Sequence, residues 1–171
     1  MNIKSEKLII VGCGDHSNVI TEAAILMGYK NIYYLVTNNP NYKKHKGKEI
    51  YHEIPKDYSS SFFIAIGHNY WREKIYDDFI NKNPKAKYIK IIHPNSYISP
   101  SAKIFPGAAI LPNSVINTGC KIKKGVIINI NCNIDHNSSL EEFSSLSPSS
   151  TVGGNTKIGK RTALLIGSSV I

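Results

Sequence analysis

One acidic residue and one histidine, Asp135 and His136, stand side by side in the stretch NCNIDHNSSLEEF, residues 131–143. A neutral imidazole, with an ordinary pKa of about 6.5, can take a proton from a nucleophile at neutral pH. A neighbouring carboxylate can fix its tautomer and stabilise the imidazolium. The pair could act as a general base, or it could be a polar corner of a loop. The stretch alone leaves both interpretations open, so the surrounding elements have to decide.

A glycine-rich stretch near the N-terminus, GCGDHS (residues 12–17), could bind a phosphate. Glycines at a strand-to-helix turn let backbone N–H groups and the helix N-terminus approach an anion. We therefore take Gly12, Gly14, His16 and Ser17 as candidate substrate-binding residues. A serine stands where the fingerprint G-x-G-x-x-G has its third glycine, which disfavours a dinucleotide site. A tight turn without a ligand, and a site for a mononucleotide or nucleotide sugar, remain the two interpretations.

A second strand-to-helix turn, IGHNYWREK (residues 66–74), contains Gly67, Asn69 and Arg72. If the strands are parallel, this turn lies at the same sheet edge as the first, where open α/β sheets bind ligands. Arg72 could then reach a phosphate or a carboxylate. The alternative is a surface arginine and an asparagine that caps the helix.

The first half of the chain alternates between strand and helix signals. The run KLIIVG is continuously apolar, as in a strand that is buried on both faces of a parallel sheet. In the first predicted helix we expect Val19, Ala23, Leu26 and Met27 to form the apolar face. These patterns predict a small open α/β sheet with strands at 7–12, 32–36, 61–67 and 87–93 and helices at 17–29 and 69–83.

From residue 93 onward a period of six replaces the helical signal. An α-helix repeats about every 3.6 residues and a strand alternates every two, so neither explains a period of six. A triangular solenoid does, because three six-residue units make one coil with each aliphatic side chain inside. Asp135 directly follows the inward Ile134, so the Asp135–His136 pair lies outside the prism. A small or β-branched residue stands two positions before each aliphatic residue of the series Ile98, Ile104, Ile110, Ile116, Ile122, Ile128, Ile134, Leu140, Leu146, Val152, Ile158, Leu164 and Val170.

The composition limits the class of protein. The chain has 171 residues, of which 42% are hydrophobic, so it can bury a core. It has no apolar run that could span a membrane and no signal-peptide pattern, and its three cysteines lack metal-ligand spacing. We therefore expect a cytoplasmic protein without a metal and without membrane contact.

The formal net charge of +9 favours anionic ligands. The densest basic run, NYKKHKGK (residues 41–48), is interpreted as a solvated surface loop. No nucleic-acid-binding signature accompanies it in the sequence, so we expect no nucleic-acid partner.

These motifs together resemble one family. The glycine turn with His16, the stretches FFIAIGHNYWREKIY and IIHPNSYISPSAKI, and the hexapeptides around NCNIDHNSSLEEF are similar to the sialic-acid O-acetyltransferase and nucleotide-amino-sugar N-acetyltransferase family. Bacillosamine and perosamine acetyltransferases are members. The resemblance implies a Rossmann-like subdomain, residues 1–92, that holds a nucleotide sugar. The resemblance also implies that residues 93–171 form a left-handed parallel β-helix of hexapeptide repeats, which binds acetyl-CoA between the subunits of a homotrimer.

The resemblance also implies roles for individual residues. The catalytic histidine of the family follows an acidic residue, and these two correspond to His136 and Asp135. An oxyanion donor is expected among the backbone N–H groups of residues 153–155. Contacts to acetyl-CoA are expected from Ser145, Gly153, Gly154 and Lys157. The chain departs from the family where a second histidine is replaced by Ser145, a glycine by Ser149, and strand-terminal aspartates by Val36 and Thr37.

The leading hypothesis is acetyl-CoA-dependent N-acetylation of a 4-amino-4,6-dideoxyhexose carried on a nucleotide, UDP above all, for bacterial surface glycan synthesis. O-acetylation of a sialic-acid-type sugar is one alternative. A non-catalytic nucleotide-sugar-binding subunit is another. Relatives continue for further coils beyond the position of Ile171, so we expect the β-helix domain to be C-terminally incomplete and its activity reduced.

Overall fold

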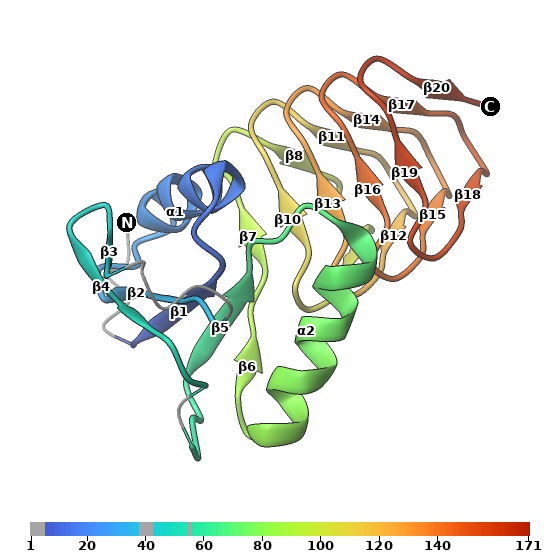
Figure 1. Ribbon diagram of the computed structural model, residues 1–171. Helices are drawn as coiled ribbons and strands as arrows, with labels where there is room; N and C mark the ends of the chain where they lie inside the picture. Colours follow the sequence, from blue (N-terminus) through green and yellow to red (C-terminus); the bar gives the residue numbers. More distant parts are fainter. Residues whose placement is uncertain (1–5, 38–42, 55) are drawn as a thin grey trace. The chain divides into compact units, whose positions relative to one another are not determined.

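The structure, a computed structural model, describes residues 6–37, 43–54 and 56–171. The chain divides into two compact units, Met1–Ile89 and Lys90–Ile171, shown in Figure 1. The sequence suggested a division after residue 92. Ile91 and Ile92 pair with a strand of the second unit, which is why the structure divides the chain before them.

The first unit is built on a sheet in which β1 occupies a central position between β2 and β5. All strand pairs of this sheet are parallel except the pair of β3 with β4. The four residues of β1 and the four of β5 are buried, as expected for strands covered on both faces. The sheet order is β3-β4-β2-β1-β5-β6, with β1(Leu8–Val11), β2(Ile32–Leu35), β3(Lys44–His45), β4(Lys48–Tyr51), β5(Ser61–Ile64) and β6(Lys87–Tyr88).

Two helices connect the parallel strands, α1(Asp15–Leu26) after β1 and α2(Asn69–Lys82) after β5. The predicted apolar face of the first helix was wrong at Val19 and Leu26, which are 40% and 44% exposed, and right at Ala23, which is buried. Small residues take their place, since the buried positions of α1 include Ala23 and Ala24 beside Ile20. Neither helix, within the described ranges, is long and apolar enough to cross a membrane.

The basic run predicted to be a solvated loop contains two strands where it is described, β3 and β4; residues 41 and 42 lie outside the described residues. Backbone pairing of β4 with β2 orders this segment whatever its side chains. His45 also packs edge-on against the Tyr34 ring, with centroids 4.6 Å apart. Lys46 forms an ion pair with Glu22 at 3.1 Å. Polar composition therefore misled the prediction, because the stabilising contacts come from residues distant in sequence.

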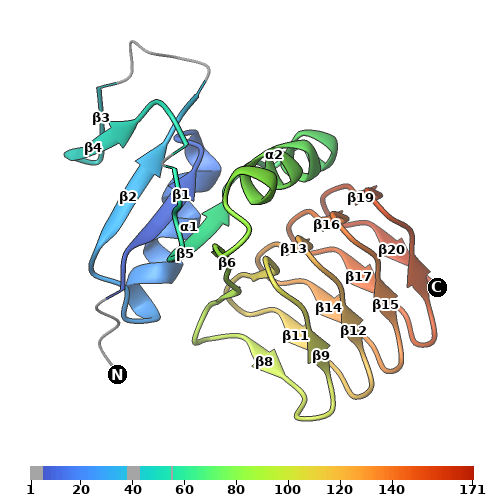
Figure 2. The same ribbon diagram turned by 90° about the horizontal axis from the view of Figure 1, so that it is seen from below.

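The second unit is a left-handed parallel β-helix, as predicted. Figure 2 shows its short strands stacked coil upon coil in three sheets, of orders β19-β16-β13-β10-β7, β20-β17-β14-β11-β8 and β18-β15-β12-β9. The predicted strand over residues 87–93 is split, with β6 in the first unit and β7 here. The strands are β7(Ile91–Ile92), β8(Tyr97–Ile98), β9(Lys103–Ile104), β10(Ala109–Ile110), β11(Val115–Ile116), β12(Lys121–Ile122), β13(Ile127–Ile128), β14(Asn133–Ile134), β15(Ser139–Leu140), β16(Ser145–Leu146), β17(Thr151–Val152), β18(Lys157–Ile158), β19(Ala163–Leu164) and β20(Ser169–Val170).

The repeating aliphatic residue is the second residue of every strand from β8 to β20. From Ile110 to Ile158 these side chains form one buried cluster inside the prism. The small residue two positions earlier is also buried at the central coils, as at Ser114, Cys120 and Ser138. Hydrophobic burial at each coil thus fixes the register of the repeat.

The corners between strands share one backbone conformation. Every sixth residue has a positive φ, where only glycine and, to a lesser degree, asparagine are comfortable. Three other residue types occur, at Phe143, Ser149 and Arg161. The positions are Gly107, Asn113, Gly119, Gly125, Asn131, Asn137, Phe143, Ser149, Asn155, Arg161 and Gly167.

Ser149 offers a test of this conformation. Its φ is +61°, a region that costs a non-glycine residue about 1 kcal/mol or more. We expect Ser149→Gly to raise the free energy of unfolding in urea by about 0.5 kcal/mol, because this gain exceeds the entropic cost of glycine. Ser147→Gly is the matched control, since Ser147 lies outside the positive-φ positions and its replacement should be destabilising. Equal destabilisation by both substitutions would contradict the corner geometry.

Candidate active site

Asp135 and His136 form the corner that follows β14. The Oδ1 atom of Asp135 accepts a hydrogen bond from the His136 backbone N–H at 2.7 Å. Its Oδ2 atom lies 3.7 Å from His136 Nε2, and the two side chains are 47% and 46% exposed. The imidazole therefore lies beside a carboxylate and is also accessible to a ligand.

Asn117, one coil earlier, orients the carboxylate. Its Nδ2 donates to Asp135 Oδ1 at 3.0 Å, while its Oδ1 accepts from the Thr118 backbone N–H at 2.7 Å. The pKa of Asp135 is held below its ordinary value, foremost by the His136 backbone N–H and also by Asn117. Asn117 was not among the site residues predicted from the sequence. The signal was present, because Asn117 and Asp135 occupy equivalent positions of successive coils, 18 residues apart.

Gly154, one coil later, lies against the imidazole. A Cβ atom placed on Gly154 would be 2.6 Å from His136 Cε1 and 2.7 Å from Nε2, so only glycine leaves room for the ring in this position. The Asn155 N–H donates to the His136 carbonyl at 2.9 Å, and the Gly153 N–H donates to the Val170 carbonyl at 2.7 Å. The Gly154 N–H has no hydrogen-bond partner in the part of the chain that the structure describes.

The structure separates the four residues expected to contact acetyl-CoA. Gly153 and Gly154 lie at the corner formed by Asp135 and His136, here called the histidine corner. Lys157 is in β18, on the neighbouring sheet, with its amine 4.0 Å from Glu141 Oε1 and its side chain 71% exposed. Ser145 is in β16, which belongs to a different sheet from β14 and β18. Ser145 does not join the corner within one chain.

The glycine turn lies where the sheet of the first unit changes direction. The strand β1 pairs with β2 on one side and with β5 on the other, so the connections after β1 and β5 meet at the carboxyl edge. Gly12 has a φ of +111°, and a Cβ there would be 3.0 Å from Ile66 Cδ1. By contrast, a Cβ on Gly14 or Gly67 would meet nothing within 4 Å, which leaves space beside both backbones.

His16 and Ser17 lie in the first turn of α1. The Ser17 hydroxyl donates to the Gly14 carbonyl at 2.6 Å and lies 3.2 Å from His45 Nε2, so it ties the turn to β3. Burial, with a second contribution from the charge of Arg72, lowers the pKa of His16 to about 4. His16 is therefore neutral at pH 7, and its buried Nε2 atom has no hydrogen-bond partner among the described residues.

Arg72 is fully buried, which corrects the prediction that it reaches a phosphate or carboxylate. Its Nη1 donates to the carbonyls of Ile66 and Gly67, both at 2.9 Å, and its Nη2 donates to Asn69 Oδ1 at 2.7 Å. Burial lowers the pKa of Arg72 to about 10, so it stays protonated at pH 7. Arg72 and Asn69 therefore hold the turn after β5 in shape.

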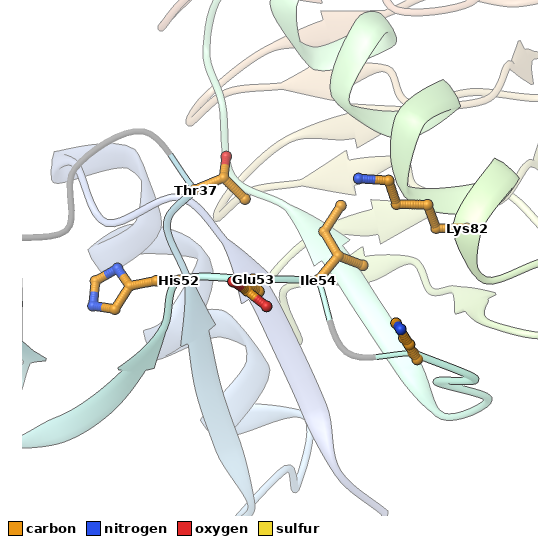
Figure 3. A pocket seen from close by; sticks show the side chains of 6 residues that line it. Thr37, His52, Glu53, Ile54 and Lys82 are labelled. Atoms are coloured by element: carbon orange, nitrogen blue, oxygen red, sulfur yellow. The ribbon is translucent and has the colours of Figure 1, made fainter.

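A hollow of about 550 Å³ in the first unit, here called the β4 hollow, contains none of the predicted site residues. Figure 3 shows Ile54 and Lys82 facing its interior, whereas the His52 ring points away from Lys82. His52 Nδ1 instead lies 3.1 Å from the Val36 carbonyl oxygen. Within the described ranges, three or more His, Cys, Asp or Glu side chains nowhere form a group that could hold a metal ion. The β4 hollow is lined by Thr37, His52, Glu53, Ile54, Lys56 and Lys82.

The two units match two family models. Residues 7–79 match the PglD N-terminal domain, and residues 92–171 match the GMPPB C-terminal domain. The acetyltransferase domain of PglB from Neisseria gonorrhoeae is 27% identical, with a TM-score of 0.86 over 95% of this chain and 81% of that domain. The same domain has also been solved in complex with acetyl coenzyme A, again with 27% identity and a TM-score of 0.86.

More distant structures share the fold. A mutant of perosamine N-acetyltransferase from Caulobacter crescentus, in complex with CoA and GDP-perosamine, is 19% identical, with a TM-score of 0.77 over 100% of this chain and 91% of that one. WeeI from Acinetobacter baumannii is 16% identical, with a TM-score of 0.76 over 88% of this chain and 74% of that one. The histidine corner, the N-terminal match and the likeness to the PglB domain support a nucleotide-amino-sugar acetyltransferase family, as the motifs predicted. The chain is an acyltransferase.

Proposed function

We propose that the protein transfers the acetyl group of acetyl-CoA to the amine of a nucleotide-linked 4-amino-4,6-dideoxyhexose for a bacterial surface glycan. The observation that carries the proposal is the half-exposed His136 imidazole, which lies beside the Asp135 carboxylate and against Gly154. The 27% identity to an acetyltransferase domain solved with acetyl coenzyme A supports the choice of donor.

The proposed reaction needs no covalent enzyme intermediate. The amine lone pair attacks the thioester carbonyl carbon, and the amine proton moves to the His136 ring nitrogen that does not face Asp135. The tetrahedral intermediate then breaks its C–S bond. The imidazolium returns the proton to the departing sulfur, which leaves the amide and CoA.

Two neighbours of His136 assist this chemistry. Asp135, ionised and held by Asn117, stabilises the imidazolium that forms during the attack. The Gly154 N–H donates to the oxyanion of the intermediate, because it lies beside the ring and is not used within the fold.

The first unit is proposed to hold the nucleotide, UDP above all, at the glycine turn. Space beside Gly14 and Gly67 supports this placement, as does the start of α1, whose dipole favours an anion. We further propose a cytoplasmic homotrimer in which a neighbouring subunit covers the exposed corner and contributes to the acetyl-CoA site. The net charge of +9 suits two anionic ligands.

A non-catalytic nucleotide-sugar-binding protein is the second candidate function. It is favoured by Ser145, which stands where the family has a second histidine and lies in a different sheet from the corner. O-acetylation of a sialic-acid-type sugar remains an alternative acceptor chemistry, because a general base would serve a hydroxyl as well as an amine.

Replacement of the proposed general base tests the function directly. Release of CoA thiol should be measured with acetyl-CoA and UDP-linked 4-amino-4,6-dideoxy sugars. We expect His136→Ala to lower kcat by about 10²–10⁴-fold, the usual contribution of general base catalysis. The matched control is His93→Ala, a corner histidine whose Nδ1 accepts from the Asn95 backbone N–H. An unchanged rate in His136→Ala would contradict the catalytic assignment. Absence of CoA release by the unaltered protein would favour the non-catalytic nucleotide-sugar-binding protein.

The role of Asn117 predicts a change in titration. We expect NMR of the Asp135 carboxyl to give a pKa below its ordinary value of 3.8, and Asn117→Ala to raise it because one stabilising donor is lost. A depressed carboxyl pKa stabilises the fold above the unfolded-state pKa, and this stabilisation disappears as pH falls through the folded-state value. Asn117→Ala should therefore weaken this acid dependence. Identical titration curves in both proteins would refute the role.

A side chain at Gly154 should displace the imidazole. We expect Gly154→Ala to lower kcat at least about tenfold, because ångström-scale misplacement of a catalytic group has effects of this size or more. Circular dichroism should show that the β-helix is retained. The control is Gly159→Ala, where a Cβ would meet only the Thr162 hydroxyl, at 3.3 Å. Equal rates in the two variants would show that the ring does not need its place beside Gly154.

A further inference from the structure

A second hollow lies along α2 in the first unit and is not used by the site described above. Its volume is about 470 Å³. Four of its residues come from α2, and each of Lys74 and Ile75 is three or four positions from both Trp71 and Asp78, so the four lie on one face of that helix. The other two follow β2 and β5. This α2 hollow is lined by Thr37, Ile66, Trp71, Lys74, Ile75 and Asp78.

Trp71 presents a large flat surface at this hollow. It is the one tryptophan of the sequence, and half of it, 50%, is exposed. Its neighbour Tyr70 packs edge-on against it, with ring centroids 5.1 Å apart. An exposed indole beside a hollow is a stacking surface for a heteroaromatic ring, since every nucleobase has a π face.

The α2 hollow adjoins the glycine turn. Ile66 lines the hollow, and its Cδ1 atom lies 3.0 Å from the position of a Cβ on Gly12. Thr37 follows β2, which is parallel to β1 and β5, so it lies at the same carboxyl edge. A molecule with its phosphates on the glycine turn can therefore extend past Ile66 into the hollow.

We propose that the α2 hollow holds the base of a nucleoside diphosphate, stacked on the Trp71 indole, while the pyrophosphate lies on the Gly12–Gly14 turn. This inference rests on the proposed function, because it assigns a place to the nucleotide of that substrate. Thr37, Lys74 and Asp78 supply a hydroxyl, an amine and a carboxylate at the rim for the polar edge of the base.

The β4 hollow is the competing place for the base. It shares Thr37 with the α2 hollow, but its other residues include Glu53, Lys56 and Lys82, and its only ring is that of His52. That ring points away from Lys82 in Figure 3. Stacking therefore favours the α2 hollow, where the aromatic surface is larger and exposed.

The single tryptophan makes the proposal measurable without an activity assay. UDP and GDP should be titrated into the full chain while Trp71 emission is recorded, and affinities should be measured by calorimetry. We expect a saturable change in emission with the nucleotides and none with inorganic pyrophosphate, which lacks a base. Trp71→Ala should weaken nucleotide binding about tenfold or more, whereas pyrophosphate binding should be unchanged.

Tyr70→Ala is the matched control, because Tyr70 is similarly exposed, at 46%, but does not line the hollow. It should retain nucleotide affinity, and Trp71→Phe should retain most of it because a flat ring remains. Two results would overturn the base site and leave the proposed function standing. One is calorimetric binding of UDP to Trp71→Ala with unchanged affinity, and the other is unchanged Trp71 emission at nucleotide saturation. Absence of nucleotide binding to the unaltered protein would count against the proposed function as well as the base site.

Discussion

Backbone hydrogen bonds between successive coils of the β-helix are the interaction on which the histidine corner depends. Asn133 and Asp135, on either side of Ile134, donate to carbonyls of the next coil at 3.1 and 2.9 Å. These bonds are possible only while the aliphatic residue of every repeat stays inside the prism. Residues 18 apart then stack in columns, so Asn117, Asp135 and Gly153 occupy one column. A β-helix thus brings side chains together from equivalent positions of neighbouring coils.

The corner conformation sets a second constraint, and the chain meets it in different ways. At most corners glycine or asparagine accepts the positive φ. Phe143 accepts it at +56° although it is bulky, and its side chain is 2% exposed. Gly125, one coil earlier, makes this possible, because a Cβ there would lie 2.5 Å from the Phe143 ring. Burial of the ring offsets backbone strain of roughly 1–2 kcal/mol. Gly154 likewise leaves room for the His136 ring, the proposed general base.

In the first unit, a buried charge supports the carboxyl edge of the sheet. Arg72 keeps its protonated guanidinium in the interior because loop carbonyls and Asn69 accept its hydrogen bonds. Removal of one partner of such a buried group is expensive, whereas a complete set of partners makes the surrounding loop rigid. Burial and, to a lesser degree, the same charge lower the pKa of His16 to about 4, so the glycine turn contains a neutral imidazole at pH 7. A rigid turn after β5 and an uncharged His16 accompany the open space beside Gly14 and Gly67.

The sequence by itself determined the β-helix, its register and the outward position of Asp135 and His136, because a period of six is compatible with one arrangement of inward residues. It also located the two strand-to-helix turns after β1 and β5, since turns at glycine depend on local backbone preferences. Tertiary structure decided what lies next to these residues. Asn117 and Gly154 join His136 only through the stacking of coils, and Arg72 turns inward because loop carbonyls accept its hydrogen bonds. The buried face of α1 and the ordering of β3 and β4 were likewise decided by packing against residues distant in sequence, which no local pattern encodes.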